Sequence, residues 1–298
     1  MRIGPGFFKA HCHGNDYLVF EEGDGPGLTP ELVRRICHRG RGPGADGIVV
    51  VEAGRPGAET RLRMFNPDGG EFERSGNGLR IAGVYLRLRG AAPDGWFPVT
   101  VGGDRVRLLV SGRRRNGAWD ALADMGRVGF PAGPPFIAPG RAGEDGVVVL
   151  ELPQPAGVEP CRIETVPVSV GNPHAVVFRR TWSRAEADHY GPLIATDAAF
   201  PRGTNVQFAD LPAGREVRVR IWERGVGRTT ASGTSACAAA AAAVKWGLMP
   251  PGPAEVLMEG GSVRVEVAED WSVRLRGPVE EVCSGELAAG FGSRPGRE

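Results

Sequence analysis

The sequence predicts an α/β (α+β) protein made of two similar halves, and three observations support this. Among its 298 residues are 46 glycines and 25 prolines, which suits many strands and tight turns better than a helical bundle. Seven of the eight residues from Ala236 to Ala243 are alanine, and small residues on every face predict a helix surrounded by protein. Three pairs of positions also recur at one offset of 157 residues: Asn15 and Asn172, Asn66 and Glu223, Ser75 and Ser232.

The single offset, kept without a gap, indicates an internal duplication and predicts two lobes packed about a pseudo-two-fold axis. We expect an N-terminal lobe over residues 1–130, with 278–298 packing back on it, and a C-terminal lobe over 131–277. The Gly- and Pro-rich segment Gly126–Pro139 is the expected connection, and Arg294–Glu298 an expected loose tail.

The strands follow in chain order from alternating or continuous apolar runs. Each half opens with a strand, a tight Gly-Asn turn and a second strand. Short buried strands and a later group consistent with antiparallel wrapping come next. The predicted segments are Phe7–Glu21, Ile48–Glu52 and Val99–Val110 in the first half, and Val166–Arg179, Asn205–Phe208, Val263–Val267 and Val273–Leu275 in the second.

A helix is predicted directly after each Ser-Gly motif. The first covers Leu79–Leu88 and stops before Gly90, and the second covers Ala236–Trp246 and stops before Gly247. The first-turn N–H groups of a helix lack partners and favour anions, so two such ends can hold a carboxylate. The plainer interpretation is that Ser75 and Ser232 are ordinary helix N-caps.

Composition excludes several function classes. The 36 basic and 35 acidic residues give a formal net charge of +1, which argues against binding to nucleic acid or anionic membranes. No apolar stretch is long enough to span a bilayer, and the first residues do not form a secretory signal. The five cysteines are widely spaced without a CxxC pair, so no disulfide framework or metal site is expected. We therefore expect a cytoplasmic protein.

Six segments give the sequence a specific resemblance to the diaminopimelate epimerases, within the cofactor-independent amino-acid racemase superfamily. They occur in family order over most of the chain. The resemblance implies two lobes, each a rolled antiparallel sheet around a central helix, with the active site between them. The segments are Lys9–Phe20 (KAHCHGNDYLVF), Gly44–Val51 (GADGIVVV), Phe65–Arg80 (FNPDGGEFERSGNGLR), Val170–Val176 (VGNPHAV), Gly203–Phe208 (GTNVQF) and Trp222–Ala238 (WERGVGRTTASGTSACA).

The two catalytic cysteines of that family correspond to serines here. In the family, one cysteine removes the substrate α-proton and the other returns a proton to the opposite face; the resemblance places these roles on Ser75 and Ser232. A thiol can be tuned to a working thiolate base, whereas a serine hydroxyl is far less acidic and needs a base of its own. Cys237, five residues beyond Ser232, is expected to be a small buried core residue.

The resemblance also implies the remaining site residues. Asparagine amides and an arginine fork suit the ammonium and carboxylate of an amino-acid end, while first-turn backbone groups suit the reacting carboxylate. Taken singly, each asparagine could equally be a turn residue, and Glu223-Arg224 a surface pair. Expected at the distal end are Asn15, Asn66, Asn172, Asn205 and Arg224; at the reacting carboxylate Gly76, Asn77, Gly233 and Thr234; and at the substrate amine or the bases Glu223 and His174.

The resulting expectation is an isomerase that converts LL- to meso-diaminopimelate, or epimerises a related amino acid, without pyridoxal phosphate, metal or other cofactor. The enzyme would act in lysine and peptidoglycan precursor biosynthesis. Its expected partner is the small amino-acid substrate, and the chain could form a homodimer. Two alternatives to a natural or Cys-to-Ser epimerase stay open. One is a superfamily isomerase that performs a different proton shift with a non-cysteine base, and the other is a catalytically silent amino-acid-binding protein.

Overall fold

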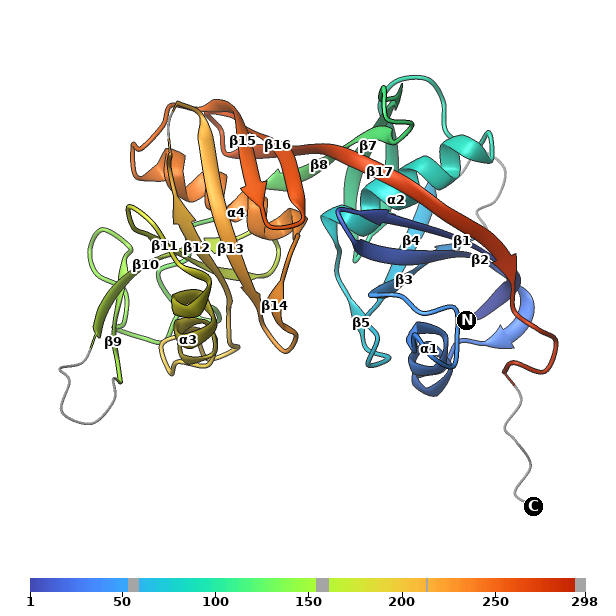
Figure 1. Cartoon of the computed structure of the whole chain (residues 1–298), viewed down its shortest axis with the longest axis horizontal. Helices are drawn as coiled ribbons and strands as arrows, with labels where there is room; N and C mark the ends of the chain where they lie inside the picture. The colour runs from blue at the N-terminus through green and yellow to red at the C-terminus, as the bar shows by residue number, and fades with distance from the viewer. Residues whose placement is uncertain (53–58, 154–160, 213, 293–298) are drawn as a thin grey trace, which may run out of the picture. The chain divides into compact units, whose positions relative to one another are not determined.

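The computed structural model describes residues 1–52, 59–153, 161–212 and 214–292, and the chain divides into two compact units (Figure 1). One unit is Met1–Ala123 with Gly277–Glu298, and the other is Asp124–Arg276. The division falls within a strand and precedes the Gly- and Pro-rich segment expected to connect the halves. The expected tail Arg294–Glu298 lies outside the described residues.

The first unit consists of strands interrupted by two helices, α1 and α2. Its last strand, β17, enters it from the second unit. The elements are β1 (Arg2–Cys12), β2 (Asn15–Gly27), α1 (Pro30–Cys37), β3 (Gly47–Glu52), β4 (Thr60–Phe65), β5 (Glu71–Phe72), α2 (Gly76–Leu88), β6 (Phe97–Val101), β7 (Asp104–Arg113), β8 (Trp119–Arg127) and β17 (Ser272–Glu286).

The second unit repeats this order of strands and helices. After β9 it begins with a hairpin, as the first unit does. The elements are β9 (Val148–Leu152), β10 (Cys161–Ser169), β11 (Pro173–Phe178), α3 (Arg184–Ala195), β12 (Asn205–Asp210), β13 (Glu216–Glu223), β14 (Gly227–Thr229), α4 (Gly233–Lys245), β15 (Gly252–Met258) and β16 (Gly261–Val267).

The 157-residue offset holds in the structure and confirms the predicted duplication. Helices α2 and α4 begin at Gly76 and Gly233 and have the same length of 13 residues. Strand pairing repeats as well. In the first unit Arg61 is paired with Thr100, and at the same offset in the second Arg218 is paired with Leu257.

Each sheet is rolled around a buried helix but is not purely antiparallel, which corrects the expected pattern. β2 pairs with β3 and β4 with β6 in parallel, and the same holds for β11 with β12 and β13 with β15. The reason is that α1, α2, α3 and α4 each lie in the connection between the two strands of one parallel pair, and parallel strands require such crossovers.

Helix α4 is surrounded by protein, as its alanines predicted. Every residue from Gly233 to Val244 is buried, and α4 crosses strands β11–β13 in Figure 1. Small side chains on all faces let strands approach it closely from several directions. Cys237 is fully buried in this helix, which confirms its predicted core position.

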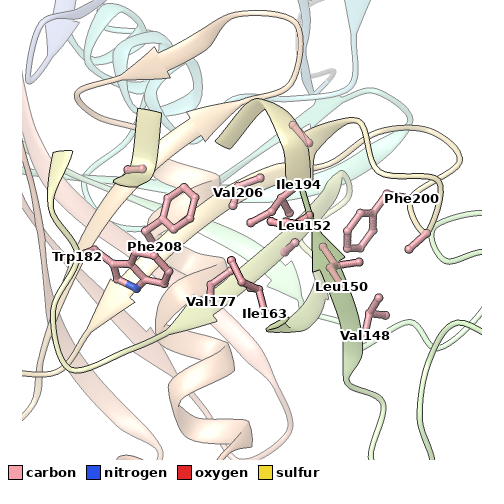
Figure 2. Close-up of a cluster of buried hydrophobic side chains, with 14 of the residues drawn as sticks. Val148, Leu150, Leu152, Ile163, Val177, Trp182, Ile194, Phe200, Val206 and Phe208 are labelled. Carbon is pink, nitrogen blue, oxygen red and sulfur yellow. The ribbon is translucent and has the colours of Figure 1, made fainter. Parts of the chain in front are cut away.

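The opposite face of β11 and β12 packs on α3. Figure 2 shows Val177 of β11 with Val206 and Phe208 of β12 in this cluster, beside Ile194 of α3. Because side chains alternate along a strand, the residues between them face the other way, toward α4. This alternation places His174, Asn205 and Gln207 on the α4 side.

Several elements differ from the sequence expectations. Val99–Val110 is a hairpin of β6 and β7 and not one strand, because Gly102 and Gly103 adopt positive φ angles of 58° and 88° and turn the chain. Helices α1 and α3 were not predicted. Strand β17 has 15 residues and extends far beyond the predicted Val273–Leu275.

Candidate active site residues

Ser75 and Ser232 are the N-caps of α2 and α4. The Oγ atom of Ser75 accepts a hydrogen bond from the backbone N–H of Gly78 over 3.1 Å. The Oγ atom of Ser232 accepts the equivalent bond from Ser235 over 3.5 Å and lies 3.5 Å from Oγ1 of Thr234. The plain N-cap interpretation is therefore correct for both. It also places both hydroxyls at the positive end of a helix.

Both helix N-termini are lined by buried backbone. Gly76 and Asn77 in α2, and Gly233 and Thr234 in α4, are all buried first-turn residues. Their helix position gives them N–H groups without intrahelical partners, which is the arrangement that binds anions. Each unit thus has a serine hydroxyl beside first-turn amides.

In the first unit, Asn15 is bonded to the start of α2. Its Oδ1 accepts from Nδ2 of Asn77 over 2.8 Å, and Oδ1 of Asn77 accepts from Arg80 over 2.5 Å. Arg80 is 1% exposed and its Nε donates to the Gly76 carbonyl over 3.3 Å. The buried guanidinium therefore fixes the Asn77 amide, which in turn fixes Asn15.

A charged cluster behind Asn15 was not found from the sequence. Nδ2 of Asn15 donates to Asp46 over 3.2 Å, and Arg39 bonds both Asp46 and Asp16, each at 2.7 Å. Lys9 lies 3.1 Å from Asp16. These residues come from two segments, around Asn15 and around Asp46, that meet because β2 and β3 are parallel neighbours. No motif within either segment indicates the contact.

The two carboxyl groups of this cluster are shifted in opposite directions. Burial opposes ionisation of Asp16, but hydrogen bonds from Arg39 and Lys9 outweigh it and lower its pKa. Burial and the neighbouring charge of Asp16 raise the pKa of Asp46. Asp16 is therefore the more readily ionised carboxyl group of the pair.

Asn66 has a different setting. It is exposed and begins the turn before β5, where its backbone N–H donates to Gly70 over 2.8 Å and its carbonyl accepts from Gly69 over 2.9 Å. Its side chain is not joined to Asn15 or Asn77 by any hydrogen bond among the described residues. The structure thus supports its turn role.

In the second unit, Asn172 contacts His174. Oδ1 of Asn172 lies 2.9 Å from Nε2 of the imidazole, which is 2% exposed. Burial lowers the pKa of His174 to about 3, and the positive charge of Arg224 adds to the effect although the neighbouring Gln207 amide opposes it. The imidazole is therefore neutral at ordinary pH and a weak base.

Asn205 uses its amide on backbone groups. Its Nδ2 donates to the Pro173 carbonyl over 3.0 Å, and its Oδ1 accepts from the N–H of Arg224 over 2.9 Å. Arg224 itself is exposed and donates to the Arg202 carbonyl over 2.6 Å. Asn205 thus fixes the end of β13, where half-buried Glu223 precedes the outward guanidinium.

The site residues expected from the sequence fall into two sets, one in each unit. Asn15 and Asn77 are directly bonded near Ser75, and Asn172 and His174 are directly bonded in the other unit. The expected residues of the first unit are Asn15, Asn66, Ser75, Gly76 and Asn77, and those of the second are Asn172, His174, Asn205, Glu223, Arg224, Ser232, Gly233 and Thr234.

A family model described as diaminopimelate epimerase matches residues 7–130 and 166–282. The chain belongs to the diaminopimelate epimerase family. The diaminopimelate epimerase of Pelotomaculum thermopropionicum is 39% identical, with 94% of this chain and 98% of that relative covered. Diaminopimelate epimerase 2 of a Nostoc species is 35% identical, with 95% of each covered. Membership in this family places the chain among the isomerases.

Solved structures agree with the fold of the diaminopimelate epimerase family. A probable proline racemase from Agrobacterium radiobacter, solved with bound carbonate, has a TM-score of 0.69 at 18% identity, covering 98% of this chain and 94% of that one. A predicted epimerase from Pseudomonas aeruginosa has a TM-score of 0.65 at 21% identity, covering 95% and 99%. The predicted α/β fold is confirmed by these similarities.

In this member of the diaminopimelate epimerase family, no helix within the described ranges is both long and apolar enough to cross a bilayer.

Proposed function

We propose that this chain binds diaminopimelate or a closely related diamino diacid and is built for pyridoxal-phosphate-independent proton exchange at its α-carbon. The matching relatives are named diaminopimelate epimerase and cover nearly the whole chain. The reaction would convert LL-diaminopimelate to the meso form. It would supply precursors of lysine and peptidoglycan.

The observation that carries the proposal is the pair of serines at equivalent helix N-termini. Ser75 and Ser232 stand where the sequence resemblance places the two bases, and each caps a helix whose first-turn amides are positioned for an anion. These amides would stabilise negative charge that builds up on the substrate carboxylate as the α-proton leaves.

The same pair limits the chemistry. General acid–base catalysis requires a base and a conjugate acid with pKa values near the working pH, and a serine hydroxyl meets neither requirement without help. We therefore propose that the unmodified chain binds its ligand well but exchanges the α-proton very slowly. Activity would be recovered when thiols replace both hydroxyls.

The second candidate function is an isomerase that performs a different proton shift with a base other than Ser75 or Ser232. His174 is a poor candidate because its pKa of about 3 leaves it almost no affinity for a proton at neutral pH. Glu223, half-buried at the end of β13, is then the first carboxylate to test.

Two measurements test the proposal. Titration calorimetry should detect diaminopimelate and show much weaker binding of alanine, because alanine lacks the distal amino-acid end. Equal affinity for the two would contradict the ligand class. Proton NMR of diaminopimelate in D₂O should show very slow α-proton loss with the unmodified chain. A fast loss that Glu223→Gln abolishes would establish the second candidate function.

A further inference from the structure

Gln207 is a fully buried amide on the face of β12 that α4 covers. Its Nε2 donates to Oγ of Ser235, also fully buried, over 3.0 Å. Burying an amide in an apolar core costs free energy unless its polar atoms are hydrogen-bonded. The Ser235 bond satisfies only the nitrogen end and holds the carbonyl oxygen in a fixed direction.

Two complementary atoms are left without a partner at this place. Nδ1 of His174 and Oε1 of Gln207 are both buried and unbonded; across the described ranges, only Nε1 of Trp182 shares that condition. His174 pairs with Asn205 across β11 and β12, so Gln207, two residues further on, lies diagonally next to it on the same face. The Gln207 side chain also interacts with the imidazole.

The choice of tautomer decides whether these atoms are satisfied. If the proton is on Nε2, it is donated to Oδ1 of Asn172, and Nδ1 and Oε1 of Gln207 are both acceptors that cannot satisfy each other. If the proton is on Nδ1, it can be donated to Oε1 of Gln207 once the two side chains come within hydrogen-bond distance, and both buried atoms then gain a partner. Nε2 then accepts a hydrogen bond from Nδ2 of Asn172 after a half-turn of that amide.

We propose that Gln207, held by Ser235, is a positioning residue that fixes His174 as the Nδ1–H tautomer and so leaves Nε2 as a hydrogen-bond acceptor beside Asn172. An acceptor there suits a substrate ammonium group, which has only donors and would replace the Asn172 N–H at the single Nε2 lone pair. This consequence for the ligand rests on the proposed function, whereas the tautomer itself does not.

The first unit has no counterpart of this arrangement. The positions equivalent to His174, Gln207 and Ser235 in strand pairing or offset are Tyr17, Val49 and Gly78. The device therefore belongs to one half of the duplication, which is consistent with a substrate amine being held from one side.

The test is nitrogen NMR of the ligand-free protein labelled with ¹⁵N-histidine, with the His174 signals assigned by their loss in His174→Asn. The two neutral tautomers give different patterns at the two ring nitrogens. The unmodified chain should show Nδ1 protonated and Nε2 unprotonated. An Nε2–H pattern in this sample would overturn the proposal without any variant.

Two variants separate positioning from packing. Gln207→Leu should move the His174 population toward Nε2–H, while Gln207→Glu, which keeps an acceptor oxygen, should retain Nδ1–H. An Nδ1–H pattern unchanged in Gln207→Leu would also overturn the proposal. If that variant does not fold, Gln207→Met serves in its place with the same two outcomes.

Ligand binding then separates this inference from the proposed function. Gln207→Leu should weaken diaminopimelate binding about tenfold, the loss of roughly one hydrogen bond, and Gln207→Glu should restore much of it. If the unmodified chain shows the Nδ1–H tautomer but binds no diaminopimelate, the proposed function fails and the positioning role stands.

Discussion

Nδ2 of Asn77 donates a hydrogen bond to Oδ1 of Asn15 over 2.8 Å, which ties the first turn of α2 to the first residue of β2. At the same offset in the second unit, Asn172 repeats Asn15 but Thr234 replaces Asn77, and Asn172 contacts His174 instead. The duplicated asparagine was kept while its supporting residues diverged. Each of the two asparagines therefore belongs to its own polar network.

The Asn15–Asn77 bond should be measurable as a coupling energy. Asn77→Ala leaves the buried Arg80 guanidinium without one acceptor, so we expect a loss of about 1–3 kcal/mol in the free energy of unfolding. In a double-mutant cycle with Asn15→Ala, urea denaturation should give an interaction energy of about 0.5–3 kcal/mol. Exposed Asn66→Ala is the control and should change stability by less than about 0.5 kcal/mol. Strictly additive effects would show that the bond does not couple the two residues.

The serine caps should contribute to stability independently of any chemistry. Ser75→Ala removes the acceptor of the Gly78 N–H, and we expect a cost of about 1 kcal/mol in thermal or urea unfolding. Ser75→Asp keeps a capping oxygen and should restore most of that stability. A Ser75→Ala variant as stable as the unmodified chain would mean that water satisfies the helix end equally well.

Stability should depend on pH through His174. Its pKa falls from 6.5 to about 3 on folding, so above pH 6.5 the imidazole is neutral in both states and contributes no pH dependence. Below pH 6.5 the unfolded chain binds a proton that the folded chain does not. The free energy of unfolding should then fall by up to about 1.4 kcal/mol per pH unit toward pH 3 from this group.

Comparison with a variant isolates that contribution. The stability of His174→Asn should decline less steeply between pH 6 and pH 4. Urea denaturation at each pH measures this decline. Exposed His189→Asn is the matched control and should keep the slope of the unmodified chain. An equal slope in the His174 variant would show that the imidazole is not buried in its neutral form.

Native thiols should not replace the missing pair of cysteines. Sγ of Cys12 lies 3.8 Å from the Asn77 carbonyl near the start of α2, but it is 1% exposed and burial raises its pKa. Iodoacetamide at pH 7.5 should label the exposed Cys283 and leave Cys12 unmodified, as peptide mass spectrometry would show. Cys12→Ser should not change the residual α-proton exchange. A lower exchange rate in that variant would identify Cys12 as a hidden base.

Local sequence signals predicted much of the fold. The alanine run gave the buried α4 because small residues on all faces suit a surrounded helix. The turn at Gly14, with a φ of 88°, followed from the Gly-Asn pair between two apolar runs. Helices α1 and α3 were missed although Thr29 caps one and Ser183 forms a capping box in the other. α1 has only eight residues, and Pro192 within α3 is a residue that argues against a helix.

The candidate site was predictable where motifs are contiguous and not where the fold brings distant residues together. Ser75 and Ser232 were found because each begins a Ser-Gly motif directly before a predicted helix, and the two motifs recur at one offset within the family resemblance. The Arg39–Asp16 contact and the Gln207–Ser235 bond depend on strand pairing and helix packing across the unit. No sequence period marks such contacts, so only the structure reveals them.

We propose that the chain retains an α-proton exchange site and lacks only its two bases. The most direct test is the rate of deuterium incorporation at the α-carbon of diaminopimelate for the unmodified chain, Ser75→Cys, Ser232→Cys and the double variant. Because the two residues would act as a unit, each single variant should gain little. The double variant should be faster than the unmodified chain by roughly 10²–10⁴-fold or more, without pyridoxal phosphate or metal. A double variant no faster than the unmodified chain, although folded and still binding diaminopimelate, would contradict the account.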